Sequence, residues 1–594
     1  MRGIGSGLAL RFQRAAIFNS YWLLLIIVVI GLFARLHSIG FVPESLWGSD
    51  VLFINQSYEL GIQSLWTRFI GFNDEVGYYF LYHRMVALIA RCLPLVLTPY
   101  IFFAGWLLSF LMVVYVLKSR AEQLGMGAIA VLLIAVAITL QPSHGEAWFN
   151  LNQAHFTTGM ALALYICMPT RKPPSMLDIV FLIVTSLSGI SCIFLLPVLA
   201  LQLLVLKDFR TRRSLYILVP ICAAIEAALL FGSGRVGAGG SNVNISDWLS
   251  ALRSFFLFGA ENWLVDLFAI LFWLLTIFGF VSWLQSDRRR ADRHLWLAPL
   301  LALLAAALMF LGAAMIMGGW LARLSPLDMA SRYLLIPYAL VFFAAVICNS
   351  DSRQRLTAMG CLILAICILT FRTVDRPDRA SSTGLLEHRN LQWLAHAKLH
   401  ELRPDAFIPV NPDWPMYPPL CRVEVPGPAS HVTEDLSRRT VTLHPQRAHF
   451  MRHDDRDWVI DAGETNTMLE FAIGEHCLGH DYLALEVDAW RSKSGDATLY
   501  WKDVGSPDRD EGSLVRFYPA GEITMQFAFR RAEQDDTLWL YPSAGVVNST
   551  VVQEFARMSL PYVKHGKVTS IVARATPPGG EIRIRSVRLI CLDD

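Results

Sequence analysis

The apolar run YWLLLIIVVIGLFARL, residues 21–36, leads after a short interval into ESLWGSD, residues 44–50. A helix needs about 20 largely apolar residues to cross a bilayer, and runs close to that length recur as far as residue 373. From residue 374 onward the sequence has no such run. It therefore predicts a polytopic α-helical membrane domain, followed by a domain outside the bilayer.

Composition agrees with this division. The chain has 594 residues, of which 54% are hydrophobic and 17% charged, and its mean hydropathy is +0.43. It is too apolar for one soluble domain and too long for one compact core. The formal net charge of +2 argues against a nucleic-acid partner and against a polybasic membrane-surface protein.

Basic residues predict how the chain is threaded through the bilayer. Arg2, Arg11 and Arg14 precede the first apolar run, and nearly every second turn after it carries Lys or Arg. By the positive-inside rule these turns and the N-terminus are cytoplasmic, and the pattern gives about eleven spans. No small-residue cleavage site follows the first run, so it is interpreted as a retained span. The predicted domains are 1–373 in the membrane, a linker helix at 374–404, and 405–594 outside.

In the last third of the chain, apolar residues follow a different pattern from the long apolar runs before it. Apolar residues alternate at 482–490, 497–501 and 581–590, with Gly, Pro and Asp-rich turns between these runs. This pattern is typical of an all-β sandwich, and a jelly-roll is the preferred version. Three cysteines in this part allow one disulfide in an oxidising compartment, although their spacing does not specify the pair; they are Cys421, Cys477 and Cys591.

The layout resembles a known family. An acidic residue, Asp50, follows the first span closely, a long external loop continues to about residue 98, and many spans precede the soluble C-terminal domain. This resembles the GT-C fold of polyprenyl-phosphate-sugar-dependent glycosyltransferases. Members of that family usually carry an acidic pair in this loop, whereas this chain has Asp50 with Glu44 six residues earlier and Asp74-Glu75 further on.

The resemblance implies an inverting transfer, which needs a base for the proton of the attacking hydroxyl. A carboxylate at the membrane surface can do this without a large pKa shift, so Asp50 is the candidate base and Glu75 the second choice. Each has a structural alternative: Asp50 would cap the helix that begins at residues 49–54, and Glu75 would be a solvated loop charge.

The second external loop, residues 141–155, is rich in hydrogen-bonding groups beside Trp148 and Phe149. Hydroxyls need donors and acceptors, and a sugar ring stacks on aromatic faces. The loop is therefore a candidate sugar or acceptor site, with an ordinary interfacial aromatic belt as the alternative. The candidate residues are His144, Glu146, Asn152 and His155. A divalent metal at these histidines, with Asp50 or Glu146, is a further alternative that the spacing does not support.

Arginines in a late external loop are candidates for phosphate binding. Arg323 and Arg332 bracket this loop, and a guanidinium binds phosphate through two hydrogen bonds and stabilises the charge of a leaving phosphate. The family resemblance favours Arg332. The alternative is that both side chains reach toward lipid headgroups. Glu226, inside a predicted span, either lines a cavity for the polyprenyl chain or has a structural role.

The resemblance, together with these candidate residues, implies a membrane glycosyltransferase, and the architecture suggests a bacterial inner membrane. The enzyme would move a sugar from a polyprenyl-phosphate donor to a glycan or other envelope acceptor on the periplasmic face. The sequence shows no nucleotide-binding motif, which a lipid-linked donor would not require. A transporter or flippase of lipid-linked glycans and a non-catalytic glycan-binding assembly protein are the alternatives. A transporter would be expected to have broken helices with charges at mid-membrane, whereas here the polar groups lie in external loops.

Overall fold

The computed structural model of the chain describes residues 23–35, 50–67, 79–143, 148–232, 244–259, 262–286, 292–327, 329–374 and 393–402, and in the C-terminal region 433–435, 442–443, 451–453, 458–461, 469–472, 477, 480–492, 495–501, 512–518, 521–530, 537–544 and 581–592. The statements below concern these residues.

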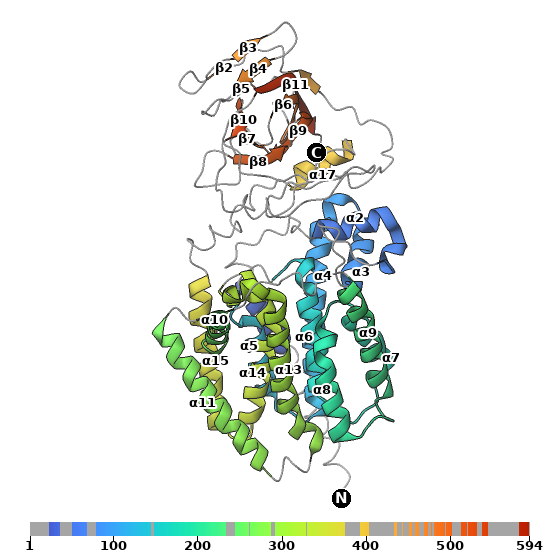
Figure 1. Ribbon diagram of the computed structural model, residues 1–594, viewed down its shortest axis with the longest axis vertical. Coiled ribbons are helices and arrows are strands. Elements are labelled where there is room, and N and C mark those ends of the chain that lie inside the picture. The colour runs from blue at the N-terminus through green and yellow to red at the C-terminus, as the bar shows by residue number, and fades with distance from the viewer. Residues whose placement is uncertain are drawn as a thin grey trace, which may run out of the picture.

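The first part of the chain is helical (Figure 1). It contains helices Leu23–Arg35, α2 (Asp50–Leu60), η1 (Gly61–Leu65), α3 (Leu81–Arg91), η2 (Leu95–Leu97), α4 (Thr98–Gln123), α5 (Ala128–Leu140), η4 (Leu151–Gln153), α6 (Ala154–Cys167), α7 (Met176–Ser186), α8 (Ser191–Leu206), α9 (Arg213–Gly232), α10 (Ile245–Phe256), α11 (Trp263–Gln285), α13 (Arg293–Met317), η5 (Gly318–Arg323), η6 (Met329–Leu334), α14 (Leu335–Asn349), α15 (Arg353–Val374) and α17 (Trp393–Leu402), where η marks a 3₁₀ helix.

Within the described ranges, six helical segments are long and apolar enough to cross a membrane: η2 with α4, α9, α11, α13, η6 with α14, and α15. Shorter apolar helices occupy Leu23–Arg35, α5, α7 and α8. These helices fit a multi-pass membrane protein. The prediction of eleven spans stays a prediction, because a helix of 13 residues such as α5 is about 20 Å long and the apolar core of a bilayer is about 30 Å thick.

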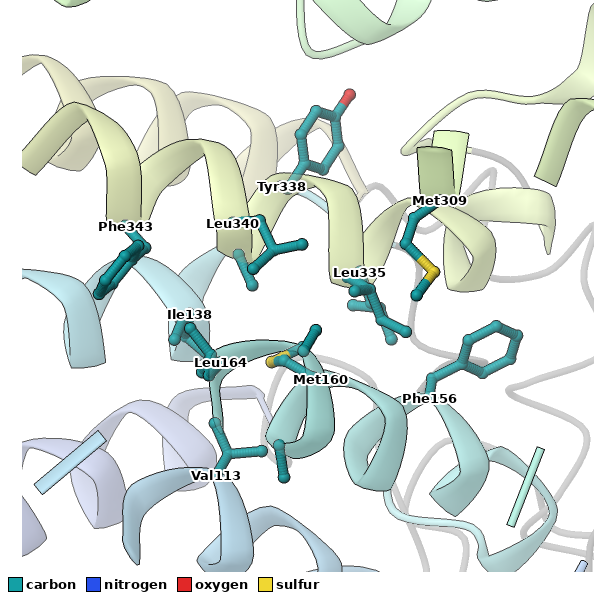
Figure 2. Packing of buried hydrophobic residues seen from close by; sticks show 14 of the residues in the cluster. Val113, Ile138, Phe156, Met160, Leu164, Met309, Leu335, Tyr338, Leu340 and Phe343 are labelled. Carbon is teal, nitrogen blue, oxygen red and sulfur yellow. The ribbon is translucent and has the colours of Figure 1, made fainter. Parts of the chain in front are cut away.

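The core of the helical part lies between α6 and α14. Every residue of α14 is buried, and α14 packs on α5, α6, α11, α13 and α15. Figure 2 shows Phe156 and Met160 of α6 facing Met309 of α13 and Leu335 of α14. Such an all-round apolar helix suits the centre of a bundle. Phe156, one residue after His155, ties the start of α6 to this core.

A glycine allows α6 to approach its neighbours closely. A Cβ added at Gly159 would lie 2.3 Å from Ser191 Oγ and 3.0 Å from Ile336 Cδ1. Helices in membranes pack most closely where one of them presents such a small residue. The position of the start of α6 therefore depends on tight packing against α8 and α14.

The C-terminal region forms two antiparallel sheets. The strands are β1 (Thr433–Asp435), β2 (Thr442–Leu443), β3 (Met451–His453), β4 (Trp458–Asp461), β5 (Leu469–Ala472), β6 (Tyr482–Arg491), β7 (Gly495–Trp501), β8 (Gly512–Tyr518), β9 (Gly521–Arg530), β10 (Thr537–Ala544) and β11 (Glu581–Leu592). One sheet has the order β3-β4-β11-β6-β9, with β1 also paired to β11, and the other has the order β2-β5-β10-β7-β8. Strands are confirmed at the three predicted runs, as β6, β7 and β11, and buried and more exposed residues alternate over much of β11, whereas β6 is buried along most of its length and the jelly-roll stays a prediction.

The helix α17 connects the two parts of the chain. It packs on β6, β9 and β11, where Ala395 and Leu399 are buried against Ala484 and Ala528. At its start, Trp393 Nε1 donates a hydrogen bond of 3.2 Å to the carbonyl of Val96 in η2. The strands therefore lie beyond the end of the helical part that carries α2 and α3 (Figure 1). α17 also falls within the predicted linker range 374–404.

A disulfide joins Cys477 to Cys591, across a separation of 114 residues. The sequence allowed one such pair but could not select it. Cys591 lies in β11, which pairs with β1, β4 and β6. The bond therefore fixes the segment before β6 to the central strand of the larger sheet.

Replacing Cys477 and Cys591 by serine is expected to lower the stability of the C-terminal sheets by about 2 to 5 kcal/mol, because the open chain regains the entropy of a long loop. The measurement is limited proteolysis of the full-length protein over a temperature series. Cys361→Ser, at an exposed free cysteine of the helical part, is the control and should not change the cleavage temperature. Equal resistance of the double variant and the wild type would contradict the expectation.

Candidate functional site

Asp50 begins α2 and is only 2% exposed. Its Oδ1 accepts a hydrogen bond of 2.6 Å from the backbone amide of Asn152, a residue 102 positions later. Asn152 lies in η4, which continues directly into α6. Amides in the first turn of a helix lack partners within it, and the helix dipole favours an anion there. Asp50 thus caps the start of η4 and α6 and ties the first external loop to the second.

The peptide of Asn152 also contacts His155. The carbonyl oxygen of Asn152 lies 2.7 Å from His155 Nδ1. The backbone of Asn152 therefore touches the carboxylate of Asp50 on its amide side and the imidazole of His155 on its carbonyl side. Asp50, Asn152 and His155, three of the residues selected from the sequence, are brought together.

A second imidazole, His83 of α3, lies beside this group. Its ring centroid is 5.0 Å from that of Phe53, 4.9 Å from that of Phe80 and 5.9 Å from that of His155. Burial lowers the pKa of His83 well below its ordinary value, and the nearby His155 acts in the same direction. His83 is therefore neutral. Asp50, His83, Asn152 and His155 are called the Asp50 cluster below.

Analysis of the sequence assigned no role to His83. The sequence placed this residue in a long external loop, whereas the structure shows it fully buried in α3. A signal was present, since Phe80, His83 and Ala87 fall on one face of a helix by their spacing. The aromatic partner Phe53 comes from α2, and no local pattern could have supplied it.

Arg332 lies close to the cluster. Its guanidinium carbon is 5.3 Å from the ring centroid of Tyr333, and Tyr333 meets Phe156 edge to face at 5.5 Å. The ring of Phe156 in turn lies 4.0 Å from that of His155. Arg332 is partly exposed in η6, whereas Arg323 is exposed at the end of η5. The structure therefore brings Arg332 toward the Asp50 cluster through Phe156 and Tyr333.

The neighbouring segment forms a separate polar group around Glu226 of α9. Glu226 is fully buried, and its Oε2 accepts a hydrogen bond of 3.1 Å from the amide of Tyr79. The hydroxyl of Tyr79 donates to the carbonyl of Leu65. Arg84 donates to carbonyls of the same external segment, those of Ser64 and Thr67. These contacts favour the structural role for Glu226, which holds the start of α3 against α9.

The aromatic residues of the second loop pack inward. Trp148 is 2% exposed; its ring lies 5.7 Å from that of Trp106 and beneath the Arg35 guanidinium at 4.1 Å. Phe149 lies 4.8 Å from Trp106 and is equally buried. These rings contribute to the core and support the loop, so they present no face on which a sugar would stack.

Three predicted site residues lie outside the described residues: Glu75, His144 and Glu146. Their assignments stay predictions. Among the residues that the structure describes, no group of three or more His, Cys, Asp or Glu side chains could hold a metal ion. The metal suggested at His144 and His155 depends on a residue outside this set and is likewise untested.

No protein-family model matches the chain, and a search of curated proteins finds no match. The chemical interpretation of the Asp50 cluster therefore depends on its own residues and contacts.

Proposed function

We propose that this protein is a membrane glycosyltransferase. It moves a sugar from a polyprenyl-phosphate donor to an envelope glycan or other acceptor on the extracytoplasmic side of a bacterial inner membrane. The observation that carries the proposal is the series of ring contacts between the Asp50 cluster and Arg332, from His155 to Phe156 at 4.0 Å, from Phe156 to Tyr333 at 5.5 Å, and from Tyr333 to the Arg332 guanidinium at 5.3 Å. A group that takes a proton and a group that holds a phosphate are the two that this reaction needs.

The residues fit the two ends of the transfer. The acceptor hydroxyl attacks the sugar carbon on the face opposite the phosphate, and its proton goes to a base of the Asp50 cluster. The bond from sugar to phosphate breaks, and its electron pair stays on the phosphate oxygen. Arg332 stabilises this charge because a guanidinium donates two parallel hydrogen bonds to phosphate oxygens. The sugar would lie between Arg332 and His155.

The rest of the chain supports this assignment. The GT-C-like layout of about eleven spans would bring the loops before α2, before α6 and before α14 to one face of the membrane. The bond from Cys477 to Cys591 suits an oxidising compartment, as a periplasmic C-terminal sandwich requires. α17 is bonded to η2 on the side of α2 and α3, where the sandwich would orient the acceptor.

A test supplies the donor from outside. Labelled polyprenyl-phosphate-sugar lipid is extracted from cells lacking the gene and added to right-side-out membrane vesicles with their own envelope acceptor. Vesicles that contain the protein are expected to move label from the lipid to the acceptor fraction. Vesicles from the deletion strain are the control.

The same assay separates the alternatives. A transporter would move labelled lipid between leaflets without forming labelled acceptor. A non-catalytic assembly protein would retain glycan but form no product, and substitutions in its strands would abolish function while Asp50→Asn would not. Failure to form labelled acceptor in wild-type vesicles would contradict the proposed transfer.

A further inference from the structure

The peptide of Asn152 connects a buried carboxylate to a partly exposed imidazole. Its N–H donates to Asp50 Oδ1 at 2.6 Å and its carbonyl oxygen lies 2.7 Å from His155 Nδ1. Hydrogen bonds arranged in series through one peptide polarise each other. The negative charge of Asp50 therefore makes the Asn152 carbonyl a stronger acceptor for His155.

This contact fixes the tautomer of His155. A backbone carbonyl only accepts hydrogen bonds, so Nδ1 of the ring carries the hydrogen. In the neutral ring Nε2 then has the lone pair. The basic nitrogen of His155 is thus the one directed away from the Asn152 backbone.

The two candidate bases, Asp50 and His155, differ in solvent exposure. Asp50 is 2% exposed and its Oδ1 is engaged by an amide, whereas His155 is partly exposed at the start of α6. A proton acceptor must come within hydrogen-bond reach of the substrate hydroxyl. His155 meets this requirement more readily than Asp50.

We propose that His155 is the catalytic base and that Asp50 is a positioning residue that acts on it through the peptide of Asn152. This inference depends on the proposed function, since it names the proton acceptor of that transfer. As the acceptor oxygen bonds to the sugar carbon, its proton moves to His155 Nε2 and the phosphate leaves with the electron pair of the broken bond. The imidazolium later loses its proton to water.

The charges around His155 suit this role. Burial lowers the pKa of His155 to about 4, and the charge of Arg332 on η6 acts in the same direction, so the ring is neutral before reaction. On the opposite side, the carboxylate of Asp50 stabilises the imidazolium once it has formed. A carboxylate behind a histidine acts in the same sense in hydrolytic triads, although here a peptide stands between the two.

The test is a double-mutant cycle in the vesicle assay with the labelled donor lipid. The variants are His155→Gln, Asp50→Asn and the double variant, each compared at equal membrane abundance over a range of acceptor. The introduced glutamine can still donate to the Asn152 carbonyl, and the introduced asparagine can still accept from the Asn152 amide, so the fold is expected to hold. Melting of the detergent-solubilised variants checks this.

The expected result is that His155→Gln lowers the maximal rate about 100-fold. The acceptor concentration that gives half of the maximal rate should not rise to a similar extent. Residues that act as a unit are not additive, so adding Asp50→Asn to His155→Gln should cost less than a further threefold. The inference would be overturned if the loss of rate in the double variant equalled the product of the losses in the two single variants. It would also be overturned if His155→Gln had a normal maximal rate and weakened acceptor binding. Absence of transfer by the wild type would instead contradict the proposed function.

Discussion

Asp50→Asn is expected to lower sugar transfer by at least about 100-fold, with little effect on folding. The asparagine side chain keeps an oxygen that can accept the hydrogen bond from the Asn152 amide, which Asp50 accepts at 2.6 Å. The change therefore removes a negative charge while it leaves the cap at the start of η4 and α6. That charge acts on the base His155, and loss of acid–base catalysis typically costs roughly 10²- to 10⁴-fold in rate.

The stability change should be small. A charge near a helix N-terminus contributes about 0.3 to 1 kcal/mol, so the melting temperature of the solubilised protein should shift by only a few degrees. Asp50→Ala removes both the charge and the acceptor and should lose activity and stability together. This difference separates the catalytic contribution from capping.

Asp247→Asn provides the matched control. Asp247 lies in the first turn of α10, where its carboxylate accepts from the amide of Asn244 in a capping box. Its replacement also removes a capping carboxylate but lies in another helix, so transfer should stay within about twofold of the wild type. Full activity in Asp50→Asn would restrict Asp50 to helix capping and would contradict its proposed action on His155 through the peptide of Asn152.

Arg332→Gln is expected to lower transfer about 100- to 1000-fold, because one stabilising group at a developing negative charge has that value in other enzymes. The substitution should lower the maximal rate and should also raise the concentration of donor lipid that gives half of that rate. Arg332→Lys keeps the charge but cannot form two parallel hydrogen bonds, and its rate should lie between those of wild type and Arg332→Gln.

Arg253→Gln tests whether any arginine near this end of the protein has such an effect. Arg253 is exposed in the last turn of α10, which packs on η5. An arginine that merely reaches toward lipid headgroups should be replaceable at little cost, so this variant should retain activity. Equal losses in both variants, or none in either, would contradict the assignment of the phosphate to Arg332.

The sequence predicted several features that depend on local pattern. The strands β6 and β11, the helix α17 and the helix that begins at Asp50 all follow from residues a few positions apart. The number of spans was less certain, because α5 to α8 are shorter than a full crossing and their ends are not marked by the apolar pattern alone.

The site could be predicted only in part. Asp50, Asn152 and His155 were selected from separate loops, but the bond from Asp50 to the Asn152 amide joins residues 102 positions apart. Local patterning does not determine such a contact. The same limit applies to Phe53 beside His83 and to the pairing of Cys477 with Cys591. Trp148 and Phe149 were predicted to lie in a sugar-binding loop because their neighbours in the sequence are polar. That pattern does not reveal that both rings are buried.

The position of β11 has a consequence for how the protein is made. This strand lies at the centre of its sheet and pairs with β1, β4 and β6, although β1 precedes it by well over a hundred residues. During synthesis, β1, β4 and β6 cannot pair with β11 until it has been made, and Cys477 cannot form its disulfide before Cys591 is present. Unpaired strand edges of an incompletely folded chain are prone to aggregation. We therefore expect this region to depend on chaperones and on oxidation of its thiols until β11 has been synthesised.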